Sequence, residues 1–366
     1  MRVGVPREIK VHEYRVGLTP TSVRELTARG HEVLVERGAG AGIGAADATY
    51  ERAGARIVAD AFEAELIVKV KEPQPAERKR LRADQVLFTY LHLAPDPEQA
   101  RDLVASGAIC IAYETVTRPG GGLPLLAPMS EVAGRMAIQV GAGCLEKERG
   151  GMGTLLAGVP GVPAAKLVIL GSGVVGANAA RIAVGSGARV FALDRSVDTL
   201  RRIESEFGAR VVTVYSSRDA IEQHVVSADL VIGAVLVPGA AAPKLVPHDL
   251  LRRMKPGAVL VDVSIDQGGC FETSRPTTHA DPTYVVDGVV HYCVANMPGA
   301  VPRTSAYALN NATLPFVLAL ADKGWKRALA DDEHLRNGLN VARGKLAHRA
   351  VADALGLGYT PADRLL

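Results

Sequence analysis

The sequence predicts an α/β protein made of two doubly wound parallel-sheet domains with a cleft between them. Short β-branched runs alternate with helical patterns in the first third of the chain, and a second series of this kind begins near Lys166. A turn-rich stretch separates the two series. At 366 residues the chain is also too long for one ordinary hydrophobic core. Alternation of strands and helices favours parallel sheets with crossover helices.

The first series of strands runs from the N-terminus to about Thr117. One crossover helix has clear ends, because Thr19 can cap it, Pro20 suits its first turn and Gly30 stands where it stops. The sequence therefore predicts a helix over Pro20–Arg29. The strands expected in this series are Arg2–Val5, Glu32–Val35, Leu66–Val70, Val86–Tyr90 and Ile109–Ala112.

The second series follows two glycine-rich stretches. Arg118–Pro124 is rich in turn residues and precedes a segment, Ser130–Glu148, whose pattern predicts a helix. The loop Gly150–Gly161 comes next. The strands expected after it are Leu167–Leu170, Arg189–Leu193, Val211–Val214, Leu230–Ala234 and Val259–Val263.

The C-terminal segment, Thr304–Leu366, has a mostly helical pattern, with Ala306–Ala321 as its best element despite Pro315. Helices of this kind need a sheet to cover, so we expect the segment to pack on the first sheet. This predicts a discontinuous domain of residues 1–125 and 303–366 around a central domain of residues 126–302.

Composition excludes several classes of protein. The 42 Lys and Arg nearly balance the 39 Asp and Glu without a basic tract, so nucleic acid is not an expected partner. No uncharged apolar run reaches the roughly 20 residues of a membrane span. Charged residues also interrupt the N-terminus where a signal peptide would be apolar, which predicts a cytoplasmic protein. The four cysteines form no C-x-x-C pair, so we expect reduced thiols and no metal site.

A dinucleotide signature stands at the start of the second series. The strand Lys166–Leu170 leads into Gly171-Ser172-Gly173-Val174-Val175-Gly176, and good helix formers follow. In such a turn the first glycine allows the tight bend, the second lets the backbone approach a pyrophosphate, and the third lets helix and strand pack closely. A lone motif of this type also occurs in simple tight turns. Its place between strand and helix favours a Rossmann-like cofactor site.

The choice of dinucleotide follows from Asp194. It ends the second strand of this series, at the spacing where a carboxylate accepts hydrogen bonds from ribose hydroxyls. A carboxylate there repels a 2′-phosphate, so the sequence favours NAD over NADP. Arg195 comes next and either softens that repulsion or is a solvated surface residue.

Chemistry on a small amino or keto acid needs a cation for the carboxylate, a donor for the carbonyl oxygen and an acid/base for the amine. Arg15 is a candidate for two-pronged carboxylate binding, although a surface arginine is the more frequent case. Lys71 follows a buried strand, at the end where α/β sheets bind ligands. Lys69 shares its face, and one of the two can be a side chain that only reaches toward solvent. His92 closes another apolar run and suits proton transfer near neutral pH, or is a hydrogen-bonded core histidine.

The central domain adds two polar candidates. Asp266 follows the strand that contains Asp262 and precedes two glycines, so it can position an ammonium or a water molecule, or cap the turn. Asn296 lies just before the chain returns to the first domain. An amide that faces the cleft and a simple turn residue remain equally open there.

At these segments the chain resembles the family of bacterial alanine dehydrogenases and transhydrogenase alpha subunits. The stretches GVPREIKVHEYRVGLTP, VKVKEP, LPLLAPMSEVAGR, GSGVVG, MKPGAVLVDVSIDQGGCFE and YCVANMPGAVPRTS carry the resemblance, in order and over nearly the whole chain. It implies a substrate domain made from both chain ends, a central NAD domain and usually a homohexamer. It also implies NAD-dependent oxidative deamination of L-alanine to pyruvate and ammonia, and the reverse reductive amination.

The resemblance further implies roles for single residues. Arg15 and Lys71 hold the substrate carboxylate and carbonyl, and His92 and Asp266 are the catalytic groups. One departure is Met152, where similar sequences often have a basic residue. The remaining implied site residues are Asn296 on the substrate side, and Ser130, Met297 and the segment Gly171–Gly176 with Asp194 on the cofactor side.

Two other functions compete with this one. The NAD-binding subunit of transhydrogenase resembles the same family, but the expected lack of a membrane span and the carboxylate of Asp266 argue against it. A catalytically silent NAD-binding protein is the second. Intact Arg15, Lys71, His92 and Asp266 argue against that reading.

Overall fold

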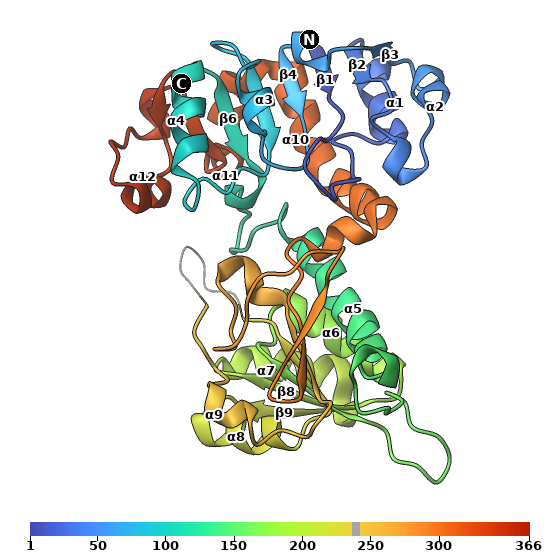
Figure 1. Ribbon diagram of the computed structural model, residues 1–366. Coiled ribbons are helices and arrows are strands. Elements are labelled where there is room, and N and C mark those ends of the chain that lie inside the picture. Colours follow the sequence, from blue (N-terminus) through green and yellow to red (C-terminus); the bar gives the residue numbers. More distant parts are fainter. Residues whose placement is uncertain (236–241) are drawn as a thin grey trace. The chain divides into compact units, whose positions relative to one another are not determined.

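The computed structural model describes residues 1–235 and 242–366, and Figure 1 shows its ribbon. The chain forms two compact units: unit 1 is Met1–Met129 with Gly299–Leu366, and unit 2 is Ser130–Pro298. The chain passes from one unit to the other at 129/130 and at 298/299. The boundaries expected from the sequence, 125/126 and 302/303, lie within four residues of these positions. Part of the stretch GAVLVPGAAAPKLV, residues 236–241, lies outside the described residues.

Unit 1 contains an eight-stranded sheet in the order β15-β14-β6-β5-β4-β1-β2-β3. The six neighbouring strands β6-β5-β4-β1-β2-β3 are parallel, as the sequence predicts. The strands are β1 (Arg2–Val5), β2 (Glu32–Glu36), β3 (Arg56–Val58), β4 (Leu66–Val68), β5 (Val86–Thr89), β6 (Ile109–Ala112), β14 (Leu339–Ala342) and β15 (Lys345–Leu346).

The helices of unit 1 cover this sheet. Thr19 caps the first of them by accepting from the Ser22 amide, with Pro20 in the first turn as expected. The long C-terminal helix breaks at Gly324 and packs against α1 and β4, far from it in sequence (Figure 1). The helices are α1 (Pro20–Ala28), α2 (Asp47–Arg52), α3 (Pro75–Arg78), α4 (Pro97–Ser106), α10 (Pro302–Asp331), α11 (Glu333–Arg336) and α12 (Arg349–Leu355).

The C-terminal segment is mostly helical, as predicted, with α10, α11 and α12, but the prediction missed a hairpin. After α11 the chain forms β14 and β15, an antiparallel hairpin that extends the sheet next to β6. A two-residue turn joins them, with φ of 49° at Arg343 and 79° at Gly344. Arginine is not a typical residue for a left-handed position, so this turn has little signal in the sequence.

Unit 2 contains a seven-stranded sheet in the order β12-β13-β11-β10-β7-β8-β9. Its strands are parallel except for β12, which pairs with β13 in an antiparallel hairpin that was not expected. The strands are β7 (Lys166–Leu170), β8 (Arg189–Asp194), β9 (Val211–Tyr215), β10 (Leu230–Gly233), β11 (Val259–Asp262), β12 (Thr283–Val286) and β13 (Val289–Tyr292). The helices are α5 (Ala127–Cys144), α6 (Val174–Gly185), α7 (Val197–Phe207), α8 (Arg218–Val226) and α9 (His248–Leu251).

Both sheets have the strand order of a doubly wound fold, so each is Rossmann-like. In unit 1 the order reverses between β1 and β4, and in unit 2 between β7 and β10. Loops that follow such a pair of strands leave on opposite faces and open a crevice at the carboxyl edge, where ligands bind in α/β proteins. The switch points therefore locate the candidate site in each unit. In the described ranges, none of the helices has the length and apolar character needed to cross a membrane.

Candidate functional site

In unit 1, the candidate residues follow three neighbouring parallel strands. Arg15 lies in the loop after β1, Lys71 in the turn after β4, and His92 in the turn after β5. Because parallel strands end at the same edge, the sheet brings the three segments to one side of unit 1.

The guanidinium of Arg15 is buried and held by Glu13. Its Nε donates to Oε1 of Glu13 at 2.6 Å, and its Nη2 donates to Oε2 at 2.5 Å. Nη1 lies 2.9 Å from Sδ of Met129. Burial opposes the charged form, but the hydrogen bonds and charge of Glu13 outweigh it, so the pKa of Arg15 is raised. Arg15 is thus not a surface residue, and a two-pronged contact to Glu13 fixes its plane.

Lys69 does not reach toward solvent. Its side chain is 0% exposed, and its Nζ donates to Oε2 of Glu8 at 3.0 Å and to Oε1 of Glu77 at 2.7 Å. The other oxygen of Glu8 accepts from the Val70 amide at 2.7 Å. Burial lowers the pKa of Lys69, but the two carboxylates raise this pKa by more. The net shift is upward, so the ammonium remains charged. We call Glu8, Lys69 and Glu77 the buried triad.

Lys71 is half-buried, in the turn directly after this triad. Its carbonyl accepts from Oγ1 of Thr89 at 2.9 Å, which ties the turn to β5. Burial raises the pKa of the neighbouring Glu72, but Lys71 and a hydrogen bond from Lys10 lower it below its usual range.

His92 lies in a left-handed turn that Glu114 holds. Its φ is 50°, and its amide donates to Oε1 of Glu114 at 2.6 Å. The imidazole is stacked on the ring of Tyr90 with 5.7 Å between centroids, and Nδ1 lies 4.0 Å from the same oxygen of Glu114. The side chain is 44% exposed, so His92 is not a core histidine.

In unit 2, each glycine of the signature turn has a different steric surrounding. Gly171 has a φ of 93°, and a Cβ on Gly176 would lie 2.0 Å from the Gly171 carbonyl oxygen. These two positions therefore need glycine for the bend and for close packing of α6. A Cβ on Gly173 would meet no atom of the described residues within 4 Å. These residues give no packing reason for that glycine, which fits a backbone left bare for a ligand at the start of α6.

Asp194 is fixed beside this turn. Its two carboxylate oxygens accept from the amide of Ser172 at 2.7 Å and from that of Ser196 at 2.8 Å. Arg195 is exposed. The carboxylate is thus placed at the end of β8 by the backbone, independently of any ligand.

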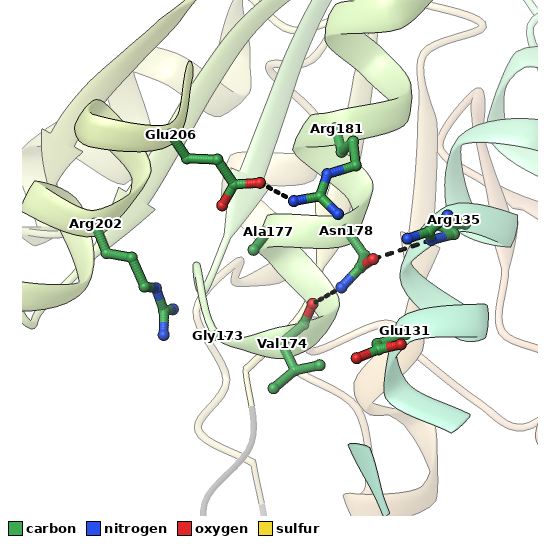
Figure 2. Close-up of a pocket in the computed structure, with 9 residues that line it drawn as sticks. All are labelled: Glu131, Arg135, Gly173, Val174, Ala177, Asn178, Arg181, Arg202 and Glu206. Atoms are coloured by element: carbon green, nitrogen blue, oxygen red, sulfur yellow. Dashed lines mark hydrogen bonds and ion pairs between the residues drawn. The ribbon is translucent and has the colours of Figure 1, made fainter. Parts of the chain in front are cut away.

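A pocket of about 300 Å³ lies beside the turn, between α5, α6 and α7 (Figure 2). Nη2 of Arg202 donates to the Ser172 carbonyl oxygen at 3.0 Å, so α7 also braces the turn. Across the pocket, Nε of Arg135 donates to Oδ1 of Asn178 at 3.0 Å, and Arg181 pairs with Glu206. The ion pair Arg181–Glu206 is thus part of the pocket lining, together with Gly173 and Val174 at the start of α6.

Asp262 organises the loop that carries Asp266. It is buried and accepts from the amides of Ser264 at 3.0 Å and Cys270 at 2.9 Å and from Oγ of Ser274 at 2.5 Å. Burial raises its pKa, which these hydrogen bonds oppose. Asp266 itself is exposed in the 3₁₀ turn Val263–Gln267.

The remaining predicted residues lie in unit 2 as follows. Asn296 has a φ of 64°, a left-handed position that asparagine tolerates, and its carbonyl oxygen lies 3.2 Å from Nε2 of His279. Met297 is buried, and Ser130 is half-buried at the first position of the unit. Met152 packs against the hydrophobic core, so the departure at this position is accommodated as an apolar contact.

Sequence reasoning missed the carboxylates that hold these groups, namely Glu8, Glu13, Glu77 and Glu114. Glu114 follows β6 directly, so the rule that strand ends carry ligands and polar partners would have found it. Glu8 and Glu13 flank no element boundary. Among the residues that the structure describes, no group of three His, Cys, Asp or Glu side chains could hold a metal ion.

Comparisons with known proteins agree with this architecture. Residues 4–133 match the family model "Alanine dehydrogenase/PNT, N-terminal domain", and residues 137–349 match "Alanine dehydrogenase/PNT, C-terminal domain". An alanine dehydrogenase of Halomonas elongata is 63% identical over 370 aligned positions, which cover all of both chains.

Two solved structures are also similar. An L-alanine dehydrogenase superposes with a TM-score of 0.94 and 54% identity, over 97% of this chain and 99% of that one. A transhydrogenase from Sinorhizobium meliloti superposes with a TM-score of 0.82 at 26% identity, over 96% of this chain and 100% of that one. Since family models match both units and the identity extends over the full length, the chain belongs to the alanine dehydrogenase/PNT family and is an oxidoreductase with a nicotinamide cofactor.

Proposed function

We propose that this protein catalyses the NAD-dependent oxidative deamination of L-alanine to pyruvate and ammonia, and the reverse reductive amination. The observation that carries the proposal is the set of polar groups at three adjacent strand ends of unit 1: a buried guanidinium, a lysine beside an ionised carboxylate, and an exposed histidine. These are the groups that a keto acid and its amine step require. The full-length similarity to alanine dehydrogenases supports the choice of alanine.

In this proposal each side chain of unit 1 has one task. Arg15 binds the substrate carboxylate, with its plane set by Glu13. Lys71 donates to the carbonyl oxygen of pyruvate, where negative charge develops as ammonia attacks the carbonyl carbon. His92 accepts and returns protons while the imine forms and breaks down.

Unit 2 supplies the cofactor site in this proposal. When bound, NAD would supply the acceptor for the hydride on the α-carbon of alanine, and NADH would supply the hydride donor for the imine in the reverse direction. The turn Gly171–Gly176 binds the pyrophosphate, and Asp194 binds the ribose hydroxyls and disfavours a 2′-phosphate. Ser130 and Met297 contact the cofactor, Asn296 the substrate, and Asp266 is the second catalytic group. Hydride transfer then requires the substrate held by unit 1 to meet the nicotinamide held by unit 2.

We further propose a cytoplasmic homo-oligomer, a hexamer by family resemblance. A short hairpin in which Val159 and Val162 form a β-bridge supports self-association, because these valines are 55% and 60% exposed. Leu155 beside them is 63% exposed. Exposed apolar groups gathered in one segment are typical of subunit contacts.

The direct test is a panel of small L-amino acids, with NAD and with NADP, at alkaline pH. We expect NADH to form with L-alanine and NAD. Activity with a different amino acid would change the proposed substrate but would leave the proposed class of reaction unchanged. If NADH forms with none of them, the catalytically silent alternative gains support. Hydride exchange between NADH and an NADP analogue, without any amino acid, would favour the transhydrogenase alternative.

A further inference from the structure

The turn after β4 and the loop after β1 are joined in unit 1 by buried charges that no step of the proposed reaction uses. Glu8 belongs to the loop that leads to Arg15, Lys69 to the turn that carries Lys71, and Glu77 to α3. The side chains of the triad are 0–2% exposed, so water does not screen these contacts.

A buried triad of this kind is a poor device for stability alone. Removing charges from water costs several kcal/mol per ion, and apolar side chains of equal size often stabilise a fold as well or better. Its benefit lies in fixed geometry, because charged hydrogen bonds at these distances tolerate little displacement. The question is therefore which geometry the triad fixes.

Glu8 makes the link between the two loops. One carboxylate oxygen accepts from Nζ of Lys69 at 3.0 Å, and the other accepts from the amide of Val70 at 2.7 Å. Both contacts are with residues that immediately precede Lys71. Burial raises the pKa of Glu8, and Lys69 and the Val70 amide oppose that rise. The negative charge of Glu13, the partner of Arg15, adds a smaller upward contribution, so the two buried clusters are electrostatic neighbours.

Glu77 acts on the same ammonium from the other side. Its Oε1 accepts from Nζ of Lys69 at 2.7 Å, and its Oε2 accepts from the amide of Gln74 at 2.7 Å, which closes the first turn of α3. Glu77 thus joins Lys69 to α3, the helix that follows it in the chain. Among the described residues, no hydrogen bond joins the Glu77 side chain to the loop after β1.

We propose that Glu8 is a positioning residue, which sets the spacing between Arg15 and Lys71 by binding the turn after β4 through Lys69 and Val70. The inference rests on the proposed function, since it assigns Arg15 and Lys71 to one substrate. A displacement of about 1 Å between two such groups lowers a rate by about 10²-fold.

The matched pair Glu8→Gln and Glu77→Gln tests this. Each variant removes one negative charge from the same ammonium and keeps an oxygen that can accept from its backbone amide. We expect Glu8→Gln to raise the KM for pyruvate about tenfold or more, with the NADH dissociation constant unchanged. Glu77→Gln should change that KM by less than about threefold. Equal effects of the two variants on KM, or none from Glu8→Gln, would overturn the inference.

A second measurement does not depend on the substrate. Amide hydrogen exchange in the segment 69–72 should become faster in Glu8→Gln than in Glu77→Gln, because Glu8 holds this segment through both the Lys69 ammonium and the Val70 amide, and loss of its charge weakens both contacts. Unchanged exchange in Glu8→Gln contradicts the inference even if the wild-type protein proves inactive toward pyruvate, an outcome that would refute the proposed function separately.

Discussion

The loops at the two switch points differ in chemistry although the sheets share one strand order. In unit 1 the loops after β1 and β4 contain buried charges, among them the pairs Arg15–Glu13 and Lys69–Glu8. In unit 2 the loop after β7 presents bare backbone at Gly173, and the nearby carboxylate of Asp194 accepts only from backbone amides in the contacts that the structure describes. A small ligand with one carboxylate needs side-chain cations, whereas a long dinucleotide is bound along a backbone. The same topology thus serves two kinds of ligand.

The largest effect is expected from Lys71→Ala. Loss of the donor to the substrate oxygen should lower kcat/KM for pyruvate about 10²- to 10³-fold. The NADH dissociation constant, measured by fluorescence, should not change, because the proposed function assigns the cofactor to unit 2. The exposed Lys79→Ala serves as the matched control. Loss of NADH binding in Lys71→Ala at an unchanged melting temperature would contradict the division between the units.

The converse variant is Gly173→Ala in unit 2. A methyl group there meets no atom of the described residues within 4 Å, so the melting temperature should stay the same. It would stand where the pyrophosphate binds, and NADH affinity should fall about tenfold, or 1.4 kcal/mol. Wild-type affinity in this variant would remove the ligand-based reason for the glycine.

Gly176→Ala is the control, because its effect should be the opposite. The added Cβ would lie 2.0 Å from the carbonyl oxygen of Gly171. We expect a loss of about 1–3 kcal/mol in the free energy of unfolding from overpacking. Thermal or urea unfolding of the two glycine variants side by side separates a packing glycine from a ligand glycine.

The variant Asp194→Asn tests whether the carboxylate in unit 2 sets the preference for NADH over NADPH. It removes the negative charge but keeps one oxygen that accepts from a backbone amide. The preference for NADH over NADPH, as a ratio of kcat/KM values, should fall by about tenfold as repulsion of the 2′-phosphate is lost. An unchanged ratio would mean that another group excludes the 2′-phosphate.

The smallest expected effect is a pH dependence from His291 in unit 2. Burial lowers its pKa below the usual 6.5, and its ring nitrogens contact the Val289 carbonyl oxygen and the Thr273 hydroxyl. The unfolded chain therefore binds the proton more tightly than the folded one. Stability from this group is complete above about pH 6.5 and is lost as the pH falls through the folded pKa. Urea unfolding between pH 7 and pH 5 measures this loss as a decrease in the free energy of unfolding. The decrease should be smaller in His291→Gln than in the wild type, by about 1 kcal/mol or less.

Much of the fold could be predicted because the hydrophobic runs coincide with the strands. The bounds of β1 and β6 agree with the sequence to the residue, and those of β7 and β10 within one. The missed hairpin of β12 and β13 did carry a signal, since Asp287-Gly288 separates two β-branched runs and both residues have positive φ. The three-residue β3 carried none, because a short edge strand has too little periodicity to detect.

The candidate site was less predictable. Residue types and strand ends identified the candidates Arg15, Lys71 and His92, but no pattern indicated which side chains hold them. Glu8 and Lys69 are 61 positions apart, and their contact exists only because β1 and β4 are neighbours in the sheet. Contacts of that range depend on topology and not on local sequence.

The most direct test of the division between the units is amide hydrogen exchange of the wild-type protein with its ligands. NADH alone should slow exchange in the segment 171–176 of unit 2. Further addition of pyruvate should slow exchange in the segments 69–72 and 90–92 of unit 1. If pyruvate instead slowed exchange only within unit 2, or NADH alone acted only on unit 1, the assignment of substrate and cofactor to the two sheets would be wrong.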